Sequence, residues 1–106
     1  MNKLRKTSHF SEILEESEKN PVIIYKHSNS CGLSTQTEIE IRNALDNEII
    51  KIPVYIVVVQ EMPVLSKNIE TFLNIKHESP QVIVLKKGKV TYNKSHHDIK
   101  PTDFIY

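Results

Sequence analysis

The residue with the clearest chemical potential is Cys31, the only cysteine among the 106 residues of the chain. It lies in the segment HSNSCGLS, residues 27–34, with Gly32 directly after it and Ser34 three positions on. A cysteine thiolate is a nucleophile, whereas a serine in the place of a second cysteine can donate a hydrogen bond but cannot close a disulfide. The Cys-X-X-Ser spacing therefore indicates thiol chemistry that uses one sulfur.

Two expected elements position this thiol. Residues 22–25 (VIIY) form a run without a polar interruption, which is typical of a strand buried on both faces of a parallel sheet. A helix then follows the cysteine, because a stripe at helical spacing is formed by Leu33, Thr37, Ile41, Ala44 and Leu45. In open α/β sheets, ligands gather where strands end and helices begin. At that junction the unpaired N–H groups of the first helical turn favour the thiolate, so we expect a pKa of the Cys31 thiol below its usual range.

The neighbours of the thiol fit this interpretation. Gly32 lacks a Cβ and lets a second sulfur or a peptide backbone approach closely, and Ser34 lies one helical turn on, where its hydroxyl can reach the sulfur. Ser30 indicates a loop, which opposes the alternative that the cysteine is an inert apolar residue of the core. We therefore predict that Cys31 is catalytic and that its thiolate is stabilised by Gly32, Leu33 and Ser34.

The segment HESPQ, residues 77–81, is the second candidate for a functional site. Its proline stands just before a predicted strand, where it cannot donate a hydrogen bond to the sheet. A cis bond between Ser79 and Pro80 would turn the backbone of Ser79 toward the sulfur. Only about 5–6% of X–Pro bonds in folded proteins are cis, so the residues alone favour an ordinary trans proline.

The remaining pattern predicts one α/β domain over residues 1–106. In chain order we expect a helix from near Thr7 or Ser8 to Asn20, the strand 22–25, the helix after Cys31, a strand at 53–59, a helix at 65–73, strands at 82–85 and 90–92, and a last helical turn from Asp98. Between the last two strands, Lys87 and Gly88 fit a tight turn, because glycine tolerates the positive φ of hairpins. A parallel pair joined by a right-handed crossover and a closing antiparallel hairpin then give a mixed four-stranded sheet flanked by helices.

Composition narrows the possible partners and cofactors. Fourteen basic and thirteen acidic residues give a formal net charge of +1, which makes nucleic acid and membranes poor partners. The chain shows neither a run of about 20 apolar residues nor the apolar region of a signal peptide, so we expect a cytoplasmic protein. A single cysteine excludes an internal disulfide and a cysteine-rich zinc site. We therefore predict no metal site, and we expect a monomer.

Taken together, Cys-X-X-Ser after the first strand and Ser79-Pro80-Gln81 before the third resemble the thioredoxin fold. The closer resemblance is to the YtxJ-type proteins of the bacillithiol system, the monothiol bacilliredoxins. It rests on residues 30–34 (SCGLS), which are similar to the Thr-Cys-Pro-Ile-Ser-like site of that family, and on residues 75–99, and it extends over nearly the whole chain. Two departures are Gly32, where the family usually has proline, and His97, where it has an aromatic residue.

The resemblance implies a role for each matching residue. Cys31 would be the redox nucleophile and Ser34 its non-resolving partner, and Pro80 would be a cis-proline. The substrate-binding residues would be Ser30, Ser79, Pro80 and Gln81. The implied activity is the removal of bacillithiol from mixed disulfides of proteins, with bacillithiol as co-substrate, bacillithiolated proteins as partners, no tightly bound cofactor, and an external thiol that resolves the adduct. His27, His96 and His97 would be bystanders.

Two alternatives remain open at this level. The tetrapeptide Cys-Gly-Leu-Ser differs by one residue from the Cys-Gly-Phe-Ser motif of monothiol glutaredoxins, which hold a [2Fe–2S] cluster between two chains. Those proteins have Val-Pro before the third strand and a glycine pair after the fourth, whereas this chain has Ser79-Pro80 and residues 92–95 (YNKS), so the longer segment opposes a cluster carrier. The other alternative is a binding module of thioredoxin-like fold without redox activity, whose thiol need not be acidified.

Overall fold

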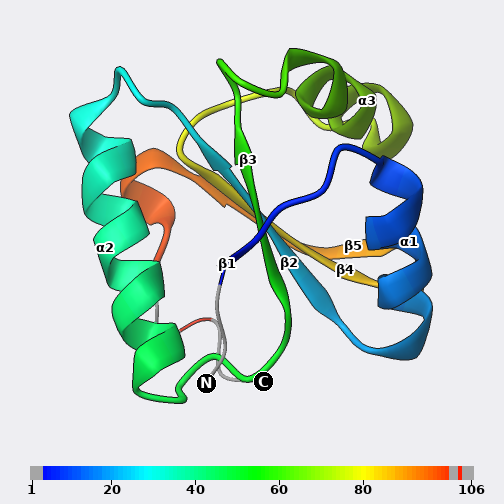
Figure 1. Ribbon diagram of the computed structural model, residues 1–106, viewed down its shortest axis with the longest axis horizontal. Coiled ribbons are helices and arrows are strands. Elements are labelled where there is room, and N and C mark those ends of the chain that lie inside the picture. Colours follow the sequence, from blue (N-terminus) through cyan, green and yellow to red (C-terminus); the bar gives the residue numbers. More distant parts are fainter. Residues whose placement is uncertain (1–3, 101–102, 104–106) are drawn as a thin grey trace.

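A mixed sheet of five strands forms the centre of the computed structural model, which describes residues 4–100 and 103 (Figure 1). The strands are β1 (Leu4–Arg5), β2 (Val22–His27), β3 (Val54–Val58), β4 (Gln81–Lys86) and β5 (Lys89–Ser95). Their order across the sheet is β1-β3-β2-β4-β5. β3 is parallel to β1 and β2, whereas β4 runs antiparallel to β2 and to β5. The expected α/β architecture with a parallel pair and a closing hairpin is confirmed.

The prediction of four strands was one strand short. Leu4 and Arg5 pair in parallel with Val54 and Tyr55 and add β1 at the edge of the sheet. A strand of two residues is too short to show a period in the sequence, since alternation is recognised over about four residues or more. Only its partner strand, which lies about 50 positions away in the chain, defines it.

Helices cover both faces of the sheet, as Figure 1 shows. α2 (Gly32–Asp46) packs on one face, and α1 (Phe10–Lys19) and α3 (Pro63–Leu73) pack on the other. Side chains alternate along β2: Ile23 and Tyr25 join the core under α2, whereas Ile24 joins the core under α1 and α3. All six residues of β2 are buried: the first four are the apolar run 22–25, as a strand covered on both sides requires, and the last two are the polar Lys26 and His27.

The turns and termini agree with the sequence with two shifts. The hairpin turn at Lys87 and Gly88 has positive φ angles of 51° and 73°, as a two-residue turn of type I′ requires. The first helix begins at Phe10 rather than near Thr7, whose hydroxyl instead accepts the N–H of His9. The last helical turn is a 3₁₀ turn over His96–Asp98, ahead of its expected start at Asp98. The end of the expected tail, residues 101–102 and 104–106, lies outside the described residues.

Candidate functional site

Cys31 lies at the end of the loop that joins β2 to α2 and is the N-cap residue of that helix. Its carbonyl oxygen accepts the N–H of Thr35 at 3.2 Å, which is the first hydrogen bond of the helix, and its own N–H donates to Ser28 O at 3.3 Å. The thiol is partly exposed. The cysteine therefore stands at the positive end of a helix of 15 residues, as its position in the sequence predicted.

Hydrogen-bond donors of the first helical turn lower the pKa of the Cys31 thiol. The largest contribution is from the backbone N–H of Ser34, and the Ser34 hydroxyl and the N–H of Leu33 add to it, against partial desolvation that acts in the opposite direction. Each donor favours the thiolate, because an N–H or O–H group stabilises negative charge on sulfur. Ser34 and Leu33 thus lie where the sequence placed thiolate-stabilising residues.

Gly32 contributes open space. No atom lies within 4 Å of the position that a Cβ would take at Gly32, and the residue is exposed. Gly32 is the first residue of α2, and it gives no hydrogen bond that lowers the pKa of the thiol. The space around this position would therefore also accept a side chain.

Gln60, which the sequence analysis did not single out, fastens the loop before the thiol. Its Nε2 donates to Ser28 Oγ at 2.7 Å and to Ser30 Oγ at 3.3 Å, and its Oε1 accepts the N–H of Asn29 at 3.0 Å. The signal that would have found it is its place just after a strand that neighbours β2, since carboxyl ends of parallel strands meet at one edge. Ser30 is therefore held by the protein itself.

Tyr25 supports the thiol site from below. Its buried hydroxyl lies 2.7 Å from Ser34 O and 2.8 Å from His27 Nδ1. The hydroxyl has one proton, and the carbonyl can only accept, so Tyr25 donates to Ser34 and His27 Nδ1–H donates to Tyr25. Burial, with the charge of Glu38 next, raises the pKa of Tyr25 and keeps the phenol neutral. The residue that provides the N–H and O–H groups for the thiolate is therefore fixed from beneath.

His27 connects that support to the surface. It is buried, and its Nε2 lies 3.8 Å from Glu38 Oε1, while Glu38 also pairs with Arg42 at 2.8 Å. The sequence pattern predicts a bystander role for His27 and, for Tyr25, a place in an apolar strand. Their polar contacts appear only when β2 and α2 are packed together, because Ser34 lies nine positions from Tyr25.

The segment before β4 lies next to the thiol loop, where β2 ends and β4 begins. Lys26 pairs with Gln81 across the antiparallel strands, so Pro80 lies opposite the end of β2 from which the thiol loop departs. The peptide bond between Ser79 and Pro80 is cis, in contrast to the trans bond that the residues alone favoured. Ser79 is partly exposed, and Pro80 is buried. The two candidate segments of the sequence are thus brought to one edge.

Gln81 and the C-terminal histidines are used differently. Gln81 is buried and holds its own segment: its Nε2 donates to Lys76 O and to Asn93 Oδ1, both at 3.1 Å. His96 and His97 are exposed, and His96 Nδ1 lies 3.9 Å from a carboxylate oxygen of Glu78. The side-chain amide of Gln81 therefore stabilises the loop that contains Ser79.

A family model described as "Monothiol bacilliredoxin BrxC" matches residues 2–104 of the chain. The chain belongs to the monothiol bacilliredoxin family. This match agrees with the longer segment, residues 75–99, and not with the glutaredoxin-like tetrapeptide. Family and fold together support a thiol redox role for this bacilliredoxin.

Solved structures place the bacilliredoxin among proteins of thioredoxin fold. One assigned as an oxidoreductase with a thioredoxin fold is 28% identical, with a TM-score of 0.78, and the match covers 92% of this chain and 86% of that one. Thioredoxin 3 from mitochondria of Saccharomyces cerevisiae is 16% identical, with a TM-score of 0.70 and coverage of 94% and 88%. The Malassezia sympodialis thioredoxin is 15% identical, with a TM-score of 0.72 and coverage of 97% and 85%. The last two likenesses show the fold alone.

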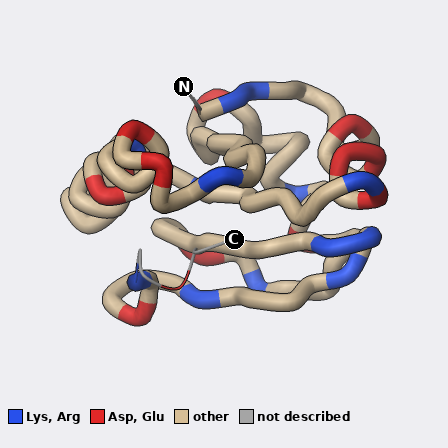
Figure 2. Tube along the Cα trace, turned by 90° about the horizontal axis from the view of Figure 1, so that it is seen from below, with Lys and Arg blue, Asp and Glu red and all other residues tan. Residues whose placement is uncertain are grey.

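Charges of both signs are spread over this bacilliredoxin (Figure 2). The acidic residues lie mainly on the helices, and lysines mark the β4–β5 turn.

Within residues 4–100 and 103, no group of three or more His, Cys, Asp or Glu side chains is placed to hold a metal ion. In the same part of the chain, no helix has the length and apolar character to span a bilayer.

Proposed function

We propose that this bacilliredoxin removes bacillithiol from mixed disulfides of proteins. The observation that supports the proposal most is the thiol at the start of α2, whose pKa is lowered by Ser34 and Leu33. A thiolate attacks disulfides, whereas a thiol does not. Cys31 is the only sulfur nucleophile of the chain, so the enzyme forms one mixed disulfide at a time.

The reaction has two thiol–disulfide exchange steps. In the first, the Cys31 thiolate attacks the bacillithiol sulfur, the disulfide to the protein breaks, and the protein leaves as a thiolate that takes a proton from water. In the second, the thiolate of a free bacillithiol attacks the bacillithiol sulfur on Cys31. This releases the Cys31 thiolate and forms bacillithiol disulfide. Each turnover therefore consumes one free bacillithiol thiol, whose sulfur is oxidised to the disulfide as the sulfur of the target protein is reduced to the thiol.

The remaining candidate residues bind the substrate. Ser30 and Ser79 present polar groups on the two segments that meet at the edge of the sheet, and Pro80 shapes the second segment. Gln81 acts through that segment, because its side chain is bonded to the protein's own groups. The exposed, uncrowded Gly32 leaves room for the second sulfur.

Intact mass spectrometry tests this function. A bacillithiolated protein is incubated with the wild type or with Cys31→Ser, and the masses of the target and the enzyme are followed with time. We expect the wild type to release the target thiol and to carry one bacillithiol until free bacillithiol is added, and we expect Cys31→Ser to do neither. Equal removal of bacillithiol by both proteins would contradict the proposal.

A further inference from the structure

A second polar site lies on the opposite face of the sheet from Tyr25. Lys26, the next residue of β2, is 1% exposed and extends its ammonium group toward α3. The ammonium donates to Ser66 O at 3.1 Å and to His77 Nδ1 at 3.1 Å. Neither partner is a carboxylate, so these two hydrogen bonds do not neutralise the charge. A buried charge that is not paired is costly for a fold.

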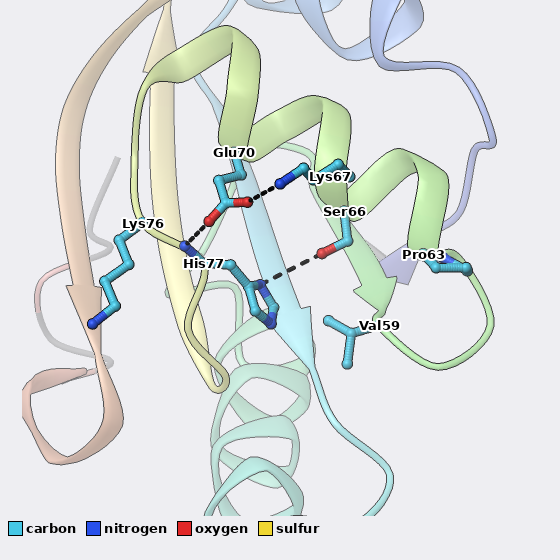
Figure 3. A pocket seen from close by; sticks show the side chains of 7 residues that line it. All are labelled: Val59, Pro63, Ser66, Lys67, Glu70, Lys76 and His77. Atoms are coloured by element: carbon cyan, nitrogen blue, oxygen red, sulfur yellow. Dashed lines mark hydrogen bonds and ion pairs between the residues drawn. The ribbon is translucent and has the colours of Figure 1, made fainter.

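A pocket of about 420 Å³ lies next to the two hydrogen-bond partners of Lys26, because Ser66 and His77 both line it (Figure 3). Such a volume is typical of sites for small molecules. The pocket lies between α3 and the segment that leads to β4, and its lining residues are Val59, Pro63, Ser66, Lys67, Glu70, Lys76 and His77. Lys26 thus provides the charge behind the wall that Ser66 and His77 form.

The contact with Lys26 fixes how His77 faces the pocket. An ammonium group has only donors, so Nδ1 of His77 must be the acceptor and the ring proton of the neutral imidazole is on Nε2. Burial, with the charge of Lys26 next, lowers the pKa of His77 and favours this neutral form. Figure 3 shows the ring reaching from its own segment toward Ser66, across the pocket. The pocket is therefore offered an N–H donor that a buried positive charge polarises.

The acidic residue of the lining does not cancel this charge. Glu70 Oε2 accepts the backbone N–H of His77 at 2.8 Å, and Oε1 pairs with Lys67 at 3.2 Å. These contacts, with the N–H of His77 first, lower the pKa of Glu70. Glu70 also attracts Lys26 and raises its pKa against the effect of burial, so it offsets part of this charge. Lys67 and Lys76 also line the pocket, and positive charge therefore remains in excess around it.

We propose that this pocket binds a carboxylate of a small ligand, with His77 Nε2–H as the donor and Lys26 as the buried counter-charge. The wall is continuous with the thiol loop, because Val59 N–H donates to His27 O at 2.9 Å and the next residue, Gln60, holds Ser28 and Ser30. A small thiol that carries carboxylates is the ligand that we assign to this pocket. Bacillithiol carries a malate group, and its assignment to the pocket rests on the proposed function, whereas the carboxylate site does not.

Titration with free L-malate, followed by the backbone amide NMR signals of the residues that line the pocket, tests the site itself. We expect a saturable shift in the wild type. In Lys26→Met the dissociation constant for malate should rise by about tenfold or more, because the buried counter-charge is lost. Lys89→Met, which removes an exposed lysine of β5, should bind malate as the wild type does. His77→Phe should abolish binding, and His77→Gln, which restores an N–H donor, should recover part of it. Absence of a saturable shift, or equal binding by wild type and His77→Phe, would overturn the site.

A kinetic arm tests the source of the carboxylate. We expect His77→Phe to raise KM severalfold for a bacillithiolated protein and to leave KM unchanged for the same protein carrying 2-mercaptoethanol, which has no carboxylate, in disulfide linkage. Malate binding with equal KM effects on both substrates would overturn the assignment to bacillithiol. The malate titration needs no turnover, so an inactive wild type would contradict the proposed function without deciding the carboxylate site.

Discussion

Tyr25 and Lys26 are consecutive residues of one strand, and each supports a different site. Tyr25 points under α2 and holds Ser34, which stabilises the thiolate, whereas Lys26 points under α3 and lies behind the pocket. Alternation of side chains along a strand makes this possible, because neighbouring residues face opposite sides of the sheet. The end of a single buried strand can therefore organise two polar networks that do not share a side chain.

The two residues differ in what burial costs them. Burial disfavours the charged form of any group, so it raises the pKa of Tyr25 and lowers the pKa of Lys26 to about 8. A tyrosine is neutral at pH 7 in any case, whereas a lysine normally is not. Lys26 therefore retains a charge at neutral pH in surroundings that oppose it. Such unfavourable arrangements concentrate at functional sites, which is why the pocket and not the phenol is assigned a ligand.

The largest effect that separates the two residues is expected from pH. The pKa of Lys26 is about 8 in the folded protein against an ordinary 10.5, so the unfolded chain binds more protons between these values. The free energy of unfolding of the wild type, relative to Lys26→Met, should therefore rise as pH increases from about 8 to about 10.5, by at most about 3 kcal/mol. Urea unfolding of both proteins across this range measures it. A difference that stays constant with pH would show that folding does not lower the pKa of Lys26.

Tyr25→Phe should have a smaller effect that does not depend on charge. It leaves Ser34 O and His27 Nδ1–H without their partner in the interior, and a buried group left unsatisfied costs about 1–3 kcal/mol. Urea unfolding at pH 7 gives the loss. Tyr55→Phe is the matched control, because Tyr55 is a buried strand tyrosine on the opposite face of the sheet. Equal losses in the two variants would mean that the contacts of Tyr25 with Ser34 and His27 stabilise nothing in particular.

The sequence predicted the thiol site better than the pocket, for a physical reason. The position of Cys31 follows from local patterns: an apolar run, a helical stripe and the residues between them. The contacts of Lys26 join it to residues 40 and 51 positions away, and a lysine in a strand gives no sign that it is buried. Gln60 was missed in the same way, since it contacts Ser28 from 32 positions away. The spacing of apolar residues along the chain predicts helices and strands. Polar partners of this kind are determined by how those helices and strands pack together.

The cis bond at Pro80 and the strand β1 are two further features that the sequence alone does not determine. The residues HESPQ alone favoured a trans bond, and only the resemblance implied the cis-proline that the structure has. Leu4 and Arg5 become a strand only because β3 lies beside them. In both places the chain alone allows more than one backbone conformation, and the tertiary structure selects one.

The smallest effect concerns the thiol itself and tests whether the two networks are independent. Ser34→Ala removes the hydroxyl but keeps the backbone N–H, which lowers the pKa of Cys31 more than the hydroxyl does. The pH at which iodoacetamide labelling of Cys31 is half-maximal should therefore rise only in part toward that of a free cysteine. Thr35→Ala, at the next and exposed position of α2, is the control and should leave the labelling profile unchanged.

Lys26→Met completes that experiment. The groups that set the pKa of Cys31 belong to Ser34 and Leu33, and the contacts of Lys26 lie on the other face of the sheet, so this variant should label as the wild type does. An upward shift in Lys26→Met as large as that in Ser34→Ala would mean that charge on the α3 side reaches the sulfur through the sheet. The pocket would then act on the thiol directly, and the separation of roles between Tyr25 and Lys26 would be wrong.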